Sequence, residues 1–225
     1  MKNIISLIAI GLTSIFIYSS CSSWSNTAKG GSVGAGAGGA IGGVLGNKSG
    51  NTTQGAILGA AIGGVTGAAI GRYMDKQKED LEEELGEVAE VERVGEGIKV
   101  TFGSGILFDF DSDGLKPTAK SSIQKMVETL EEYPDTEIMV TGHTDSEGSE
   151  KYNLRLSEER AKAVVEYAKL LGLNSDRLIP LGLGETQPVA KNDSEIGRAQ
   201  NRRVEIAIYA NEELKQKVKD GEVGK

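Results

Sequence analysis

Glycine recurs at every fourth position in two registers near the start of this 225-residue chain. The registers consist of Gly30, Gly34, Gly38, Gly42 and Gly46, and of Gly55, Gly59, Gly63, Gly67 and Gly71. Residues four apart lie on one face of a helix, and a glycine face lets another backbone approach closely. Each interior glycine costs about 1 kcal/mol relative to alanine, so such helices need close packing or lipid to form. We therefore expect residues 30–71 to form a glycine-zipper helical hairpin.

The sequence does not decide whether this hairpin lies in a membrane, on a membrane or in water. Residues 30–46 and 55–71 have 17 residues each, or roughly 25 Å of helix, which is at the short limit for a hydrocarbon core of about 30 Å. The hairpin could span a membrane or lie on it, and it could self-associate into a homo-oligomer. The alternative is a flexible Gly/Ala tether without stable helices. The strict period of four favours the hairpin.

The N-terminal end has the pattern of an export signal. Lys2 precedes an apolar run over residues 4–18, and Ser19 and Ser20 then lead to Cys21, the only cysteine. A basic start, a short apolar run and small residues before the cut are typical of secretory signals. The pattern resembles the bacterial lipobox, although Tyr18 stands where an aliphatic residue is usual. We expect a signal peptide over 1–20, acylation of Cys21 and a lipidated linker over 21–29.

Composition excludes several classes of function. The net charge of −8 argues against a nucleic-acid partner, because phosphate binding needs a basic face. The chain has one cysteine and one histidine, which excludes an internal disulfide, a multi-cysteine metal site and a histidine cluster. We therefore expect no metal, no cofactor and no enzyme. Residues 72–97 are expected to be an acidic connector, because positions 75–92 hold nine acidic residues and two lysines on what we interpret as a solvated helix.

Residues 98–210 predict an α+β domain. After a hairpin over 91–102, we expect strands at 105–110, 136–141, 177–181 and 204–208, the last from alternating Val204, Ile206 and Ile208. Helices are expected at 117–132 and 153–171, from apolar residues spaced three and four apart. The order is β-α-β-α-β-β, a sandwich with helices on one face of the sheet. Residues 211–225 form a polar tail that we interpret as a frayed helix.

Ordered motifs in this domain resemble a known family. They are Phe108-Asp109-Phe110-Asp111, Gly142-His143-Thr144-Asp145, Asn153-Leu154-Arg155-Leu156-Ser157, Arg160-Ala161, Gly182-Leu183-Gly184-Glu185 and Gly197-Arg198-Ala199-Gln200-Asn201-Arg202-Arg203-Val204. They resemble the OmpA C-terminal, peptidoglycan-associating domain. With the lipobox and the zipper in front, the whole chain is similar to YiaD-type lipoproteins. The resemblance implies non-covalent binding of the diaminopimelate-containing stem peptide of peptidoglycan.

The residue types suit that ligand. The side-chain end of diaminopimelate carries a carboxylate and an ammonium on one carbon, so it needs a fixed cation beside a fixed anion. The arginine fork binds two carboxylate oxygens at once, and aspartate suits an ammonium. The resemblance implies that Arg160 holds the carboxylate and Asp145 the ammonium. Asn153, Asp111 and Arg203 match positions that line the same pocket.

Three functions follow from these expectations. The first is a tether in which acyl chains and zipper sit in the outer membrane while the C-terminal domain binds peptidoglycan in the periplasm. The second is a membrane-active oligomer or envelope assembly factor, in which wall binding only positions the zipper. The third is a cell-wall hydrolase, which is disfavoured because the chain has one histidine and no evident nucleophile.

Overall fold

The structure is a computed structural model that describes residues 51–61 and 64–223. All of these residues belong to one compact unit, Val33–Lys225. The expected signal peptide, the lipid site Cys21, the linker and the first glycine register lie outside the described residues.

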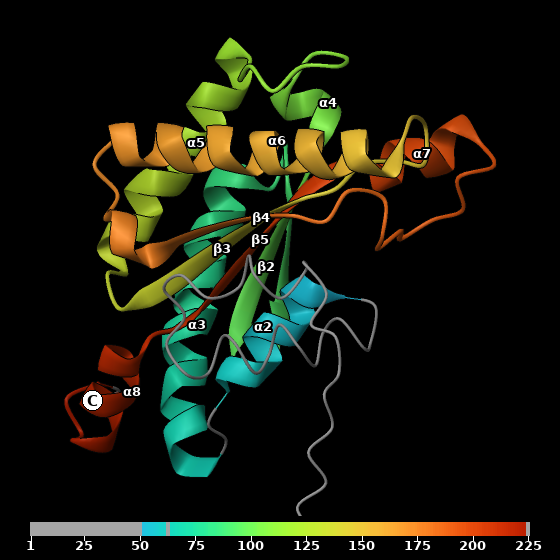
Figure 1. The fold of residues 1–225 in the computed structure, drawn as a ribbon. Helices are drawn as coiled ribbons and strands as arrows, with labels where there is room; N and C mark the ends of the chain where they lie inside the picture. Colours follow the sequence, from blue (N-terminus) through green and yellow to red (C-terminus); the bar gives the residue numbers. More distant parts are fainter. Residues whose placement is uncertain (1–50, 62–63, 224–225) are drawn as a thin grey trace, which may run out of the picture. The chain divides into compact units, whose positions relative to one another are not determined.

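A five-stranded sheet organises the described part of the chain (Figure 1). Its strands are β1 (Glu90–Val94), β2 (Gly97–Gly103), β3 (Thr136–Gly142), β4 (Leu178–Gly182) and β5 (Arg203–Ala210). They lie in the order β1-β2-β5-β3-β4, and only the β3–β4 pair is parallel among them. That parallel pair needs a crossover, which α6 (Glu150–Leu170) supplies.

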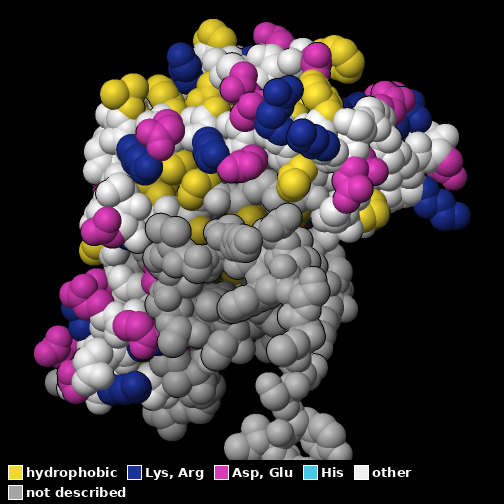
Figure 2. Space-filling model, in the orientation of Figure 1, with side chains coloured by type: hydrophobic (Ala, Val, Ile, Leu, Met, Phe, Trp, Pro, Cys, Tyr) yellow, Lys and Arg dark blue, Asp and Glu magenta, His cyan; other side chains and the backbone are white. Residues whose placement is uncertain are grey.

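Helices α5 (Pro117–Glu132) and α6 cover one face of the sheet. Pro117 opens α5, where its missing N–H costs nothing. Ile123, Met126 and Leu130 recur on one face of α5 and are buried in the main core. The exposed face of α6 carries interleaved acidic and basic side chains, including Lys162 paired with Glu158 (Figure 2). The α+β sandwich expected from the sequence is therefore confirmed.

The other face of the sheet is covered by a helix from the second glycine register. Helix α2 (Thr52–Ala60) ends at Ala61, whose backbone is extended, and α3 (Gly64–Leu85) begins three residues later. The second arm of the expected hairpin is thus two helices and not one. No helix among residues 51–61 and 64–223 combines the length and the apolar character needed to cross a membrane.

Helix α3 corrects the expectation of a solvated acidic connector. Met74, Leu81 and Leu85 are fully buried in the main core, where α3 packs against α5 and α8 (Glu212–Lys219). Three buried apolar residues over three turns are enough to fix one face of α3, while its acidic residues occupy the other. Residues 212–219 of the expected tail form α8, which buries Leu214 and Val218.

The expected strand at 105–110 is wrong. Residues Ser104–Leu107 form the short helix α4, and only Phe108 makes a β-bridge, to Leu115. A short apolar run does not distinguish a buried strand from a buried helical turn. The first strand of the expected order is instead β2, which pairs with β5. Helix α6 begins at Glu150 because Ser149 caps it, three residues before the expected start. A short 3-10 helix, η2 (Ser175–Arg177), and α7 (Glu195–Asn201) were not expected.

Candidate functional site

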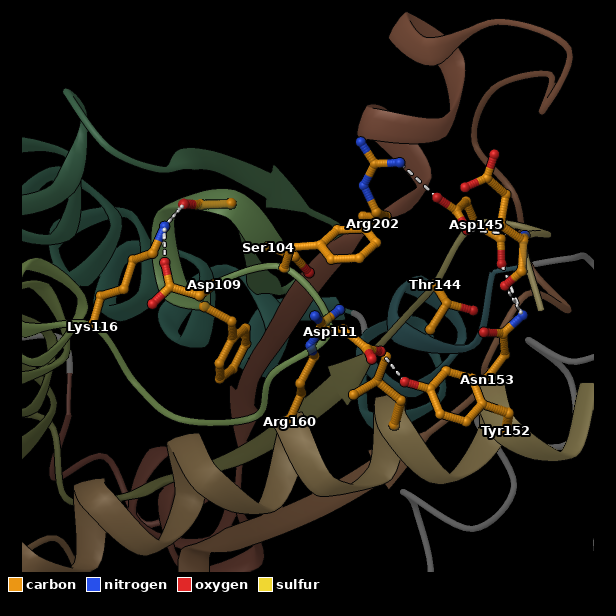
Figure 3. A pocket seen from close by; sticks show the side chains of 15 residues that line it. Ser104, Asp109, Asp111, Lys116, Thr144, Asp145, Tyr152, Asn153, Arg160 and Arg202 are labelled. Carbon is orange, nitrogen blue, oxygen red and sulfur yellow. Dashed lines mark hydrogen bonds and ion pairs between the residues drawn. The ribbon is translucent and has the colours of Figure 1, made fainter. Parts of the chain in front are cut away.

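A pocket of about 290 Å³ opens beside the N-terminal half of α6 (Figure 3). Its walls come from four places: α4 and the loop after it, the loop after β3, α6 itself, and the end of α7. Four of the five binding residues expected from the sequence, Asp111, Asp145, Asn153 and Arg160, line it. The fold therefore brings together residues that are up to 49 positions apart, from 111 to 160.

Asp145 supplies the buried anion of the pocket. It follows β3 on a loop whose backbone is held by Thr144 N–H donating to the carbonyl of Gly184, at 3.0 Å. The residue is 6% exposed, and one of its carboxylate oxygens accepts a 3.0 Å hydrogen bond from the backbone N–H of Glu147. The other oxygen accepts from Nη1 of Arg202 at 2.6 Å. A cation of the protein thus already occupies one side of this carboxylate.

Arg160 supplies the fixed cation. It is 5% exposed, its Nε donates to the carbonyl of Ser112 at 2.9 Å, and its guanidinium lies 5.2 Å from the ring centroid of Phe108. Burial lowers the pKa of Arg160, which remains a cation because guanidinium groups are not deprotonated in proteins. Among the described residues, its two terminal nitrogens have no hydrogen-bond partner, so the fork is available to a ligand in the pocket.

Asp111 and Asn153 hold the two loops against α6. The hydroxyl of Tyr152 donates to Asp111, whose positive φ of 54° turns the loop toward the helix. The amide of Asn153 donates to the carbonyl of Asp145 at 3.2 Å and to Oε2 of Glu185 at 2.5 Å. Asn153 thus positions the loop that carries the buried anion, and Asp111 adds a second negative charge at the rim.

Arg203, the fifth expected residue, does not line the pocket. It is 4% exposed and its Nε donates to the carboxylate of Glu205 at 2.7 Å. Its neighbour Arg202 lines the pocket instead. Arg202 ends α7 as its C-cap, whereas Arg203 is the first residue of β5. The inward alternation of Val204 and Ile206 would have placed Arg203 on the opposite face from the main core.

Other pocket residues were missed from the sequence. Phe110 is 94% exposed at the rim, and Ser104 and Thr144 carry buried hydroxyls with no partner among the described residues. Lys116 adds a further cation at the rim and pairs with Asp109 at 3.3 Å. An apolar residue beside acidic positions on a loop is the only sequence signal that would have indicated Phe110.

His143 lies behind the pocket and does not line it. It is 1% exposed, and burial, together with Arg203, lowers its pKa to about 3. The imidazole is therefore neutral near pH 7. Within the described ranges, no group of three or more His, Cys, Asp or Glu side chains is arranged to hold a metal ion. What the pocket offers chemically is a buried anion and a buried cation facing one hollow.

Two family models match parts of this chain. Residues 107–202 match the model of the OmpA family, and residues 1–75 match that of the YMGG-like Gly-zipper. The chain is 38% identical over 118 residues to the probable lipoprotein YiaD of Escherichia coli, covering 52% of this chain and 54% of that protein. It is 37% identical over 111 residues to the peptidoglycan-binding protein ArfA of Mycobacterium bovis, covering 49% and 34%.

Among solved structures, the cell wall anchor of the type VI secretion system from Pseudomonas aeruginosa superimposes with a TM-score of 0.53 at 28% identity. That match covers 58% of this chain and 97% of the other. The chain spans about half or less of the length of the two curated relatives named above.

Proposed function

With an OmpA-family domain at residues 107–202 as the premise, we propose that this protein is a non-enzymatic tether that binds peptidoglycan non-covalently. The ligand is the diaminopimelate stem peptide, held by its zwitterionic end. Relatives described as peptidoglycan-binding and as a cell wall anchor support the coarse function. The observation that carries the proposal is the pocket itself, in which the buried carboxylate of Asp145 and the buried guanidinium of Arg160 face one hollow.

The charge arrangement explains how the ligand is oriented. The free fork of Arg160 binds the ligand carboxylate, and the ligand ammonium approaches Asp145 from the pocket side. Binding of the ammonium competes with Arg202, which already donates to that carboxylate. A stem-peptide side chain that carries an ammonium but no carboxylate leaves the terminal nitrogens of Arg160 without a partner, which is costly. Selection therefore depends on the presence of both charges on one carbon of the ligand.

The test is co-sedimentation of the purified protein with peptidoglycan sacculi. Truncating one partner of a buried charge pair costs about 2–5 kcal/mol, so Arg160→Ala is expected to weaken binding by roughly 30-fold to a few thousand-fold. Asp145→Asn is expected to weaken it as well. The matched control is Arg155→Ala, because Arg155 lies on the same helix with its side chain 66% exposed, and this variant should bind like the wild type. Retained binding by a folded Arg160→Ala protein would contradict the assignment.

The chemical identity of the ligand needs its own experiment. Free diaminopimelate should inhibit sedimentation, whereas Nα-acetyl-lysine amide, which carries a side-chain ammonium but no carboxylate, should not. Sacculi whose stem peptides carry lysine in place of diaminopimelate should bind weakly. Equal binding to both kinds of sacculi would be consistent with a peptidoglycan tether but would contradict the proposed selectivity for diaminopimelate. Intact sacculi after long incubation would support a protein without hydrolase activity.

The anchor completes the proposed tether. We propose that Cys21 is acylated and that the lipid places the protein in the outer membrane with the OmpA-family domain in the periplasm. Two weak attachments on one chain reinforce each other through effective concentration, so modest affinity for the wall suffices. Cys21→Ala is expected to move the protein from the membrane fraction to the soluble fraction, and mass spectrometry of the mature N-terminus would identify the acyl chains.

A further inference from the structure

The second glycine register makes contacts that a membrane anchor would not make. In α2, Ala56, Ile57 and Ala60 are 1%, 1% and 5% exposed. They form a second core with apolar side chains on the face of the sheet that α5 and α6 leave free. These side chains are Met139, Ala207 and Tyr209, with Ile179 and Leu181 partly buried at the margin. Helix α2 thus covers an apolar surface of the sheet.

A reciprocal pair of hydrogen bonds fixes the start of α2 to the C-terminal domain. The backbone N–H of Thr52 donates to Oε1 of Gln187 at 2.9 Å, and Nε2 of Gln187 donates to the Thr52 hydroxyl at 2.7 Å. Both side chains are buried. The carbonyl of Gln187 also accepts from Arg203 at 3.1 Å. The helix start is therefore joined to residues that lie directly behind the pocket.

Glycines allow these elements to approach closely. A Cβ atom at Gly97, in the first position of β2, would lie 2.5 Å from Cγ2 of Ile57. In α3, the carbonyl of Gly71 accepts a hydrogen bond of 3.2 Å from Arg93 of β1. Gly71, the last glycine of the second register, thus lies beside Arg93 of β1, while the sheet contacts of α2 come from Ala56, Ile57 and Ala60.

Helices α2 and α3 lie on opposite faces of the sheet at its β1 edge. Helix α2 belongs to the second core, whereas Ile70 and Met74 of α3 are fully buried in the main core with α5. Leu58 of α2 lies close to the β1–β2 turn, because a Cβ atom at Gly95 would be 2.8 Å from its Cδ2; Figure 1 shows α2 and α3 beside the sheet. We call this pair of helices, residues 52–85, the clasp.

We propose that the clasp is a fixed part of the OmpA-family domain and that the membrane-facing part of the anchor ends before Asn51. The two glycine registers then have different partners: the second packs on the chain's own sheet, and only the first is left for lipid or for another copy of the chain. The start of α2 also lies beside the buried pair of Arg203 and Glu205, because Gln187, which is hydrogen-bonded to Thr52, accepts a hydrogen bond of 3.1 Å from Arg203. Withdrawing α2 into a bilayer would expose that pair together with the apolar second core.

Two adjacent positions in α2 provide a matched test. Leu58 is 57% exposed and Ile57 is 1% exposed in the docked helix. The full chain, reconstituted in vesicles of phosphatidylethanolamine and phosphatidylglycerol, would carry Ile57→Cys or Leu58→Cys. It would be treated with a maleimide that does not cross bilayers, and peptide mapping would separate these sites from Cys21. Leu170→Cys, at a position that is 79% exposed on α6, measures the accessible fraction.

We expect Leu58→Cys to react at a rate close to that of Leu170→Cys, and Ile57→Cys at least about tenfold more slowly, because docking protects it except during local opening. If Leu58→Cys is shielded from the water-soluble reagent and reacts with a membrane-soluble one, α2 lies in lipid and the proposal is wrong. If both positions react rapidly, α2 is undocked and the proposal is equally wrong. Ala56→Cys, a smaller change at a position that is 1% exposed, repeats the measurement should Ile57→Cys disturb packing. The labelling uses no sacculi, so its outcome is independent of wall binding.

Discussion

Substitution of two adjacent arginines should lower the stability of the fold to very different extents. Arg203 is buried, and its guanidinium donates to Glu205 at 2.7 Å, to the carbonyl of Asn201 at 3.3 Å and to that of Gln187 at 3.1 Å. Arg202 reaches into the pocket, where its side chain is 29% exposed. Arg203→Ala removes the partner of a carboxylate that is 2% exposed, whereas Arg202→Ala leaves Asp145 beside a hollow that water can enter.

The magnitudes differ enough to be measured. Removing one partner of a buried ion pair costs about 3–5 kcal/mol, so Arg203→Ala should lower the free energy of unfolding by about 4 kcal/mol. With a urea dependence of about 2 kcal/mol per molar, the unfolding midpoint should fall by about 2 M. Arg202→Ala should cost about 1 kcal/mol or less, which corresponds to about 0.5 M. Circular dichroism in a urea titration of the full chain gives both midpoints.

The double variant Arg203→Met with Glu205→Leu is the control. Replacing both members of a buried pair by apolar residues of similar size is often neutral, so this variant should regain most of the lost stability. Equal midpoints for Arg203→Ala and Arg202→Ala would show that the pair beside α2 is not buried as described. A double variant as unstable as Arg203→Ala would show that the loss comes from packing and not from an unpaired charge.

Three further predictions concern the rest of the fold. The pKa of His143 is about 3 in the folded protein, against an ordinary value of 6.5. As the pH falls, the imidazole is therefore protonated in the unfolded chain before it is protonated in the folded one. Stability should therefore fall as the pH drops from 6.5 toward 3, and His143→Gln should flatten this dependence in urea titrations at several pH values; an unchanged slope would contradict it. Gly182→Ala places a Cβ 2.5 Å from the backbone nitrogen of Glu158, so it should destabilise by about 1–3 kcal/mol and lower the thermal midpoint, and an unaltered midpoint would speak against this close approach. Ile57→Ala should cost about 2–5 kcal/mol in the same titrations, whereas Leu58→Ala should stay within about 0.5 kcal/mol, and similar small effects would disprove docking of α2.

The sequence predicted regular elements well where one periodicity dominated. Apolar residues spaced three and four apart placed α5 correctly, and the alternation of Val204, Ile206 and Ile208 placed β5. The apolar run at 105–110 was too short for either period, and the ring of Phe108 within it is placed by a contact with a distant residue, the guanidinium of Arg160 at 5.2 Å. Local pattern carries no information about such a long-range contact.

The candidate site was predicted in part. Asp145 and Arg160 were expected from ordered motifs, and the fold brings both to one pocket. Arg203 was expected in the pocket from the resemblance, whereas in the fold it begins β5 and pairs with Glu205, and Arg202 lines the pocket. The partner of the second glycine register could not be predicted, because a glycine face indicates close approach of some backbone and does not distinguish lipid-embedded helices from a sheet of the same chain.

The ion pair between Arg202 and Asp145 also bears on how long an attachment lasts. An empty pocket does not leave its carboxylate without a counter-ion, since the 2.6 Å contact with Arg202 supplies one. The ammonium of the ligand must therefore exchange with the side chain of Arg202, which returns to Asp145 when the ligand dissociates. The protein is proposed to hold a polymer that a growing cell cuts and reseals. Rebinding of the Arg202 guanidinium to Asp145 therefore favours short-lived, repeated attachments over permanent ones.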